Sequence, residues 1–79
     1  MDKDCIVLCK NWFDKHPKYS IEKKVICIYD LYQSYIIDED VETELYAYVD
    51  PDDTIQNPAE LWFNDDSENE LANAINAMS

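Results

Sequence analysis

The chain contains no glycine among its 79 residues, and this absence limits the turns that it can form. Glycine is the usual residue wherever the backbone takes a positive φ, as in tight turns, bulges and the ends of helices. A two-residue hairpin favours Asn-Gly or Asp-Gly, and neither dipeptide occurs here. We therefore expect such turns either to be few or to use Asn and Asp, and helices to prevail over a meander of strands.

Size and composition predict a single acidic domain over residues 1–79. Hydrophobic residues make up 47% of the chain, which is too many for the disordered class despite a net charge of −12. The three cysteines are an odd number without a secretory segment, so free thiols in a reducing compartment are expected. No apolar run is long enough for a signal or a membrane span, and we expect a cytoplasmic protein, in the host bacterial cytoplasm if phage-encoded.

Apolar spacing predicts a first helix over residues 4–15, followed by Pro17 as a stop. Ser20 is suited to cap a second helix with a broad apolar stripe. The stripe consists of Ile21, Val25, Ile28, Tyr29, Tyr32, Tyr35 and Ile36. Three further apolar residues extend this stripe around almost the whole circumference of the helix. We therefore expect this helix to be central and buried. The β-branched residues within 24–29 would also fit a strand, which is the alternative.

Residues 38–49 fit a helix and an alternating strand equally well. Residues 50–53 predict a turn, because proline and aspartate both favour turns. Helix starts are predicted at Asn57, with Pro58 at its first position, and at Ser67, with Glu70 completing a capping box. The expected fold is mainly α, a small single-domain bundle of four or five short helices. The alternative is an α+β fold with a short strand or hairpin within 24–49.

Charge is segregated along the sequence. All six lysines lie in the first 24 residues, whereas residues 25–79 contain fourteen carboxylates and no lysine, arginine or histidine. Formal charges are +2 for the first part and −14 for the second, which together give −12. Because net charge governs steering and association rather than fold, this pattern predicts a basic partner surface and disfavours direct nucleic-acid binding.

Enzymatic and metal chemistry are not expected. A chain without glycine cannot form a glycine-rich phosphate loop. Asp50, Asp52 and Thr54 alternate as calcium ligands do, but Ile55 and Leu61 stand where an EF-hand loop needs glycine and a bidentate acid. The three cysteines lack the spacing of a structural zinc site, and the single histidine, at a predicted helix end, suits an interaction with that helix terminus. We predict no catalytic residue, no metal and no cofactor.

The acids of the C-terminal part are the predicted partner-binding residues. With the two tyrosines proposed as aromatic anchors, the set is Asp38, Glu39, Asp40, Glu42, Glu44, Tyr46, Tyr48, Asp50, Asp52, Asp53, Asp65, Asp66, Glu68 and Glu70. Duplex DNA carries one charge per roughly 1.7 Å, so fourteen carboxylates correspond to about 24 Å of duplex. The sequence therefore predicts a small acidic inhibitor that occupies the basic nucleic-acid-binding surface of a target protein. This would be a DNA mimic of the anti-CRISPR or anti-restriction type, encoded by a phage or mobile element.

Two other interpretations remain open at this point. An acidic protein–protein interaction module, such as an immunity protein, antitoxin or adaptor, would neutralise a basic partner without mimicking nucleic acid. Alternatively, the acids serve solubility alone, although a net charge of −12 exceeds the magnitude of roughly 2 to 8 that suffices for a small domain. The expected partner is a basic nucleic-acid-binding protein or complex, with neither nucleic acid nor membrane bound directly.

Overall fold

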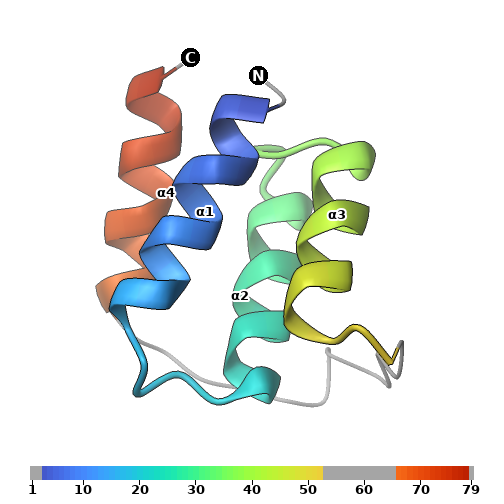
Figure 1. Cartoon of the computed structure of the whole chain (residues 1–79). Coiled ribbons are helices and arrows are strands. Elements are labelled where there is room, and N and C mark those ends of the chain that lie inside the picture. The colour runs from blue at the N-terminus through green and yellow to red at the C-terminus, as the bar shows by residue number, and fades with distance from the viewer. Residues whose placement is uncertain (1–2, 53–65, 79) are drawn as a thin grey trace.

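The structure is a computed structural model that describes residues 3–52 and 66–78, and these residues form four helices. They are α1 (Lys3–Lys15), α2 (Ile21–Gln33), α3 (Glu39–Val49) and α4 (Asp66–Met78) (Figure 1). No strand occurs in these two ranges. The predicted mainly helical fold is confirmed, and the alternative strand or hairpin within 24–49 is not formed.

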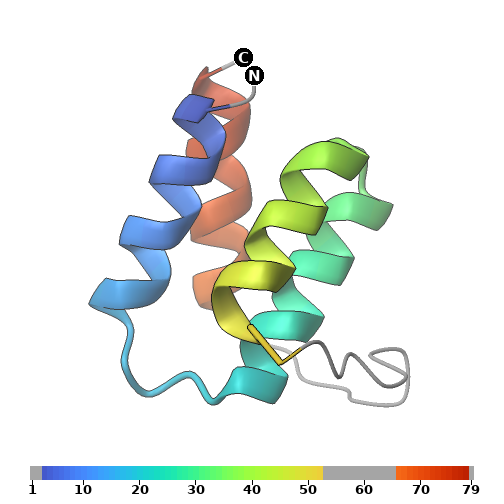
Figure 2. The same ribbon diagram turned by 45° about the vertical axis from the view of Figure 1, so that its right-hand side comes forward.

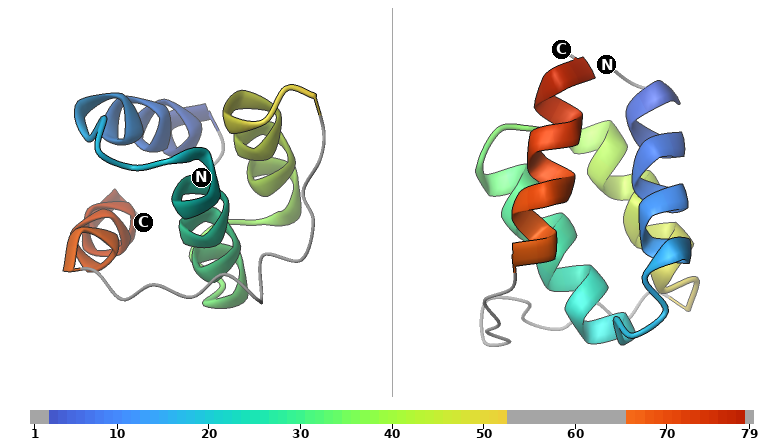
Figure 3. Two further views of the ribbon diagram at one scale, coloured as in Figure 1. Left: turned by 90° about the horizontal axis from the view of Figure 1, so that it is seen from below. Right: turned by 90° about the vertical axis from the view of Figure 1, so that its left-hand side faces the viewer.

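The helices form a bundle in which α1 and α3 run in one direction and α2 and α4 run in the other (Figures 1 and 2). α1 packs against both α3 and α4, and α2 packs against α3. Seen end-on, α3 and α4 lie at opposite corners (Figure 3, left). The α2–α3 connection therefore lies at the same end as the start of α1, and the α1–α2 connection lies at the opposite end.

The predicted first helix is confirmed. Cys5, Cys9 and Phe13, at intervals of four along α1, are fully or almost fully buried. This spacing places all three side chains on one face, which contributes to the core. At the helix end, the backbone N–H of His16 donates to the Phe13 carbonyl oxygen at 3.1 Å, just before Pro17.

α2 is the central helix, as predicted. The Ser20 hydroxyl accepts a hydrogen bond from the backbone N–H of Lys23 at 3.3 Å, which confirms the predicted cap. Residues 25–28 are all buried, so this turn of the helix is covered on every side. The predicted stripe is wrong at both ends, because Ile21 is 55% exposed and Tyr35 lies outside the helix with 94% of its surface exposed.

A Schellman motif ends α2 before Tyr35. The N–H of Tyr35 donates to the Tyr32 carbonyl oxygen at 3.0 Å, and the N–H of Ile36 donates to the Leu31 carbonyl oxygen at 3.1 Å. This pair of bonds requires a left-handed residue between them, and Tyr35 supplies it with a φ of 61°. Tyr35 has the one positive φ among the described residues, which agrees with the expectation that such turns would be few, although the residue is a tyrosine rather than Asn or Asp.

Residues 38–49 form a capped helix, which settles the ambiguity of the alternating pattern. The Asp38 carboxylate accepts a hydrogen bond from the Val41 backbone N–H at 3.0 Å, so α3 starts directly after it. Val41, Leu45 and Val49 are buried at intervals of four. The next residues, Asp50 to Asp52, leave the helix in a turn, as predicted.

α4 contributes Leu71 and Ile75 to the core, and both are fully buried. It begins at Asp66, so Ser67 lies within the helix and is not its cap, contrary to the prediction. The predicted helix starting at Asn57 lies outside the described residues. Across the described part of the chain, no helix combines the length and apolar character needed to span a bilayer.

Candidate protein-binding surface

The outer face of α3 is acidic. The exposed residues of this helix are Glu39, Asp40, Thr43, Glu44 and Ala47, which alternate with the buried Val41, Leu45 and Val49 at helical spacing. The Thr43 hydroxyl donates to the Glu39 carbonyl oxygen at 2.9 Å, so it is engaged within the helix. Glu39, Asp40 and Glu44 thus dominate this surface, which we call the acidic face of α3.

Helix electrostatics account for part of this acidity. The N-terminal end of a helix carries a positive partial charge, which stabilises nearby carboxylates. Asp38 caps α3, and Glu39 and Asp40 lie in its first turn. The same argument does not extend to Glu44, which faces Asp40 one turn away, where like charges destabilise a helix. Stabilisation by the helix N-terminus therefore explains the acids in the first turn of α3. It does not explain Glu44.

Glu42 differs from its neighbours because it is half-buried. Burial raises the pKa of its carboxyl group, and the negative charge of Glu39 raises it further. The charged form of Glu42 is therefore less favourable in the folded protein than in the unfolded chain. This places Glu42 at the border between the acidic face and the core.

Tyr46, predicted as an aromatic anchor, is half-buried. Its hydroxyl is buried, with no hydrogen-bond partner among the described residues. Burial and the charge of Glu42 raise the pKa of this hydroxyl, so Tyr46 stays neutral across the physiological range. Most of the side chain serves packing between α3 and its neighbours, and a role as an anchor for a partner stays a prediction.

Tyr48, the other predicted anchor, connects α3 to α1. Its hydroxyl donates a hydrogen bond to the Asp14 carboxylate, and this bond raises the pKa of Tyr48. The ammonium group of Lys10 lies 5.4 Å from the centre of the Tyr48 ring, close enough for a cation–π contact. Tyr48 thus makes both contacts with residues of its own chain. Its role in partner binding likewise stays a prediction.

The structure distributes the predicted acids over three places. Asp38 and the acidic face of α3 begin at one end of the bundle, whereas Asp50 and Asp52 follow α3 at the other end (Figure 1). Asp66 and Glu68 belong to the start of α4, and the exposed Glu70 follows them. α4 occupies the corner opposite α3 (Figure 3, left), so this helix does not adjoin the acidic face of α3. Asp53 and Asp65 lie outside the described residues.

Four of the six lysines lie away from Asp38 in space, whereas Lys3 starts α1 at the same end as Asp38 and Lys10 contacts Tyr48 of α3. Lys15, Lys18, Lys23 and Lys24 surround the α1–α2 connection, at the end of the bundle opposite to Asp38 (Figure 1). α2, which separates the two ends, has 13 residues and is therefore about 20 Å long. Exposed charges that far apart are screened, because the Debye length is about 8 Å at physiological ionic strength.

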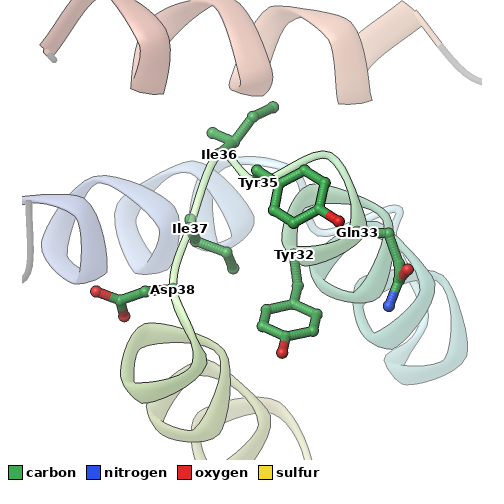
Figure 4. A pocket seen from close by; sticks show the side chains of 6 residues that line it. All are labelled: Tyr32, Gln33, Tyr35, Ile36, Ile37 and Asp38. Carbon is green, nitrogen blue, oxygen red and sulfur yellow. The ribbon is translucent and has the colours of Figure 1, made fainter.

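A pocket at the α2–α3 connection was not predicted from the sequence. It has a volume of about 560 Å³ and is lined by Tyr32, Gln33, Tyr35, Ile36, Ile37 and Asp38. In Figure 4 the two tyrosine rings and Gln33 lie on the α2 side of the connecting backbone. The Asp38 carboxylate lies on the other side, at the start of α3, and Ile36 points toward α4.

The cysteines and the histidine, which could carry covalent or metal chemistry, are buried or take part in contacts within the chain. Cys5, Cys9 and Cys27 are buried and form no disulfide with one another, and burial together with Cys5 raises the pKa of the Cys9 thiol. His16 donates through Nδ1 to the Trp12 carbonyl oxygen at 2.7 Å and stacks on the indole ring, which confirms its interaction with the end of α1. Within residues 3–52 and 66–78, no group of three potential metal ligands comes together.

Comparison with known proteins identifies no relative. No protein-family model matches the chain, and no curated protein and no solved structure shows significant similarity to it.

Proposed function

We propose that this protein is a small inhibitor that binds the basic nucleic-acid-binding surface of a target protein. The observation that carries the proposal is the acidic face of α3. Its three exposed carboxylates and the Asp38 cap belong to a segment, residues 25–79, that contains no lysine, arginine or histidine. Such a surface attracts a partner whose own charges are unpaired cations, as in a groove that normally holds phosphates.

The dimensions of the molecule fit this role. The chain measures 30 × 25 × 22 Å along its principal axes. About 24 Å of duplex DNA carries fourteen phosphate charges, so the molecule is comparable in size to the length of duplex that equals residues 25–79 in charge. The structure presents only part of this charge on the acidic face of α3. Carboxylates would meet the lysines and arginines of the target by charge-assisted hydrogen bonds. We infer that the protein is an inhibitor of the anti-CRISPR or anti-restriction type, encoded by a phage or mobile element.

The experiment that tests the function is a pull-down with the tagged full chain from nuclease-treated bacterial lysate at low and high salt. Captured proteins are identified and then challenged with duplex DNA or guide RNA. Salt-sensitive capture of a nucleic-acid-binding protein, reversed by nucleic acid, would support the proposal. Capture of a partner that nucleic acid does not displace would overturn it in favour of an immunity protein, antitoxin or adaptor.

A further inference from the structure

We propose that the pocket at the α2–α3 connection binds an arginine side chain of the basic partner, an inference that rests on the proposed function. The proposal concerns residues 32–38, which lie beside the acidic face of α3. Three observations support it: the exposure and backbone conformation of Tyr35, the composition of the pocket and the charge around it. The chemistry of cations on aromatic faces then favours arginine.

Tyr35 is unusual in two respects at once. It is 94% exposed, and it holds a left-handed backbone conformation with a φ of 61°. That conformation is unfavourable for a residue with a β-carbon, and glycine or asparagine would meet the needs of the Schellman motif at less cost. Neither the core nor the helix end therefore requires a tyrosine here. Residues held in such conformations concentrate at binding sites, which makes the exposed ring a candidate for contact with a ligand.

The pocket offers both apolar and polar contacts to a long side chain. The rings of Tyr32 and Tyr35 and the aliphatic Ile36 and Ile37 can cover a methylene stem. The Gln33 amide lies on the same side as the two rings (Figure 4) and can accept a hydrogen bond through its oxygen. Long cationic side chains bury their stems in this way while the charged head stays at the rim.

Charge around the pocket favours a cation. Asp38 lines it, and the exposed Glu39 and Asp40 follow directly. The C-terminal end of α2, which carries a negative partial charge, has no basic residue in its last turn. The N-terminal end of α3 repels a cation, but its partial charge is only about +0.5. The negative charge of the nearby carboxylates is larger. The occupant is therefore a positively charged side chain.

Arginine fits these surroundings better than lysine. A guanidinium group is planar and weakly hydrated, so it stacks on aromatic faces, whereas an ammonium group is compact and strongly hydrated. Cation–π contacts accordingly involve arginine more often than lysine. The two tyrosine rings of the pocket supply faces for such a contact. A basic nucleic-acid-binding surface would present arginines of this kind.

The test is a titration of the ¹⁵N-labelled full chain with hexaarginine and with hexalysine, two probes of equal charge, followed by amide chemical shifts. We expect hexaarginine to bind about twofold to fivefold more tightly, as one exposed cation–π contact predicts. It should shift the amides of Gln33, Tyr35 and Ile36. Tyr35→Gly should remove the preference for arginine and keep the weaker, salt-dependent attraction to both peptides.

Two control variants separate the ring from other effects. Tyr35→Phe keeps the aromatic face and should retain the preference, and Ile21→Ala removes an exposed apolar side chain at the far end of α2 and should also retain it. Equal affinity of the natural chain for both peptides would overturn the proposal. So would shifts confined to the acidic face of α3, or a preference that survives in Tyr35→Gly.

The pocket and the proposed function can fail separately. If a captured partner is displaced by nucleic acid but binds Tyr35→Gly as tightly as the natural chain, the pocket proposal falls and the function stands. If hexaarginine occupies the pocket but nucleic acid displaces no captured partner, the function falls and the arginine site stands.

Discussion

The Asp38 carboxylate accepts a hydrogen bond from the backbone N–H of Val41 at 3.0 Å, and this bond fixes the start of α3. Asp38 thereby has a structural role as the cap of α3. The exposed carboxylates of the acidic face, which follow it, form no such cap. Charge variants that test binding should therefore spare Asp38, because its loss would confuse weaker binding with a weaker fold.

Asp38→Ala should lower the free energy of unfolding by about 1 kcal/mol, the usual effect of removing a helix cap. Asp38→Asn should come close to the natural chain, since asparagine caps helices about as well as aspartate. Urea unfolding of the three proteins provides the measurement. A Asp38→Ala variant as stable as the natural chain would show that the cap contributes nothing.

Tyr35→Gly should raise the free energy of unfolding by about 1 kcal/mol, because glycine adopts a positive φ without the clash of a β-carbon. Tyr35→Ala is the matched control, since it removes the same ring but keeps the β-carbon. Thermal and urea unfolding should rank the glycine variant above the alanine variant. The opposite order would contradict a left-handed residue at this position.

Glu42→Gln should stabilise the protein at neutral pH and have little effect in acid. The folded-state pKa of Glu42 is raised by burial and by Glu39, so the folded protein binds its proton more readily than the unfolded chain does. The stability that protonation provides is present below the unfolded pKa and is lost as the pH rises through the folded pKa. Unfolding curves of both proteins from acid to neutral pH measure this difference, and a constant difference would contradict the assignment.

The three thiols should resist modification in the folded protein. Cys5, Cys9 and Cys27 are buried, and burial raises the pKa of Cys5 and Cys9, so little reactive thiolate forms. A chromogenic disulfide reagent should react slowly under native conditions and with all three thiols in denaturant. Rapid native reaction of one thiol would show that this part of the core opens or is exposed.

Much of the helical fold could be predicted from the sequence. Apolar residues at intervals of three and four before Pro17 predicted α1. The Ser20 cap and the apolar run after it predicted α2 as a central helix. Residues 38–49 were ambiguous because their apolar residues satisfy both helical and strand periods. The aspartate cap, three residues before Val41, resolves the ambiguity in favour of the helix.

The pocket could not be predicted because it depends on where α2 ends. Apolar spacing continues past Gln33 through Tyr35 and Ile36, which made Tyr35 resemble a core residue. A glycine in a sequence indicates where the backbone can take a positive φ, whereas a tyrosine gives no such indication. The acidic face was predictable in composition, but spacing alone could not place α4 at the corner away from α3. That separation comes from the packing of α1 between them.

The acidic face of α3 is the surface that we propose to bind a basic nucleic-acid-binding protein. The direct test compares two charge-matched double variants, Asp40→Asn/Glu44→Gln on that face and Asp4→Asn/Glu22→Gln elsewhere. All four residues are exposed, and each variant changes the net charge from −12 to −10 by removing two charges. Both are measured for affinity to the partner captured by the natural chain, with competing duplex DNA or guide RNA.

We expect the α3 variant to lose about tenfold in affinity, the effect of two rim charge pairs, and the control variant to bind almost as the natural chain does. The loss should shrink as salt rises, because rim charges act through a screened field. Equal affinity of the two variants would contradict the claim and show that net charge, rather than the acidic face of α3, draws the partner.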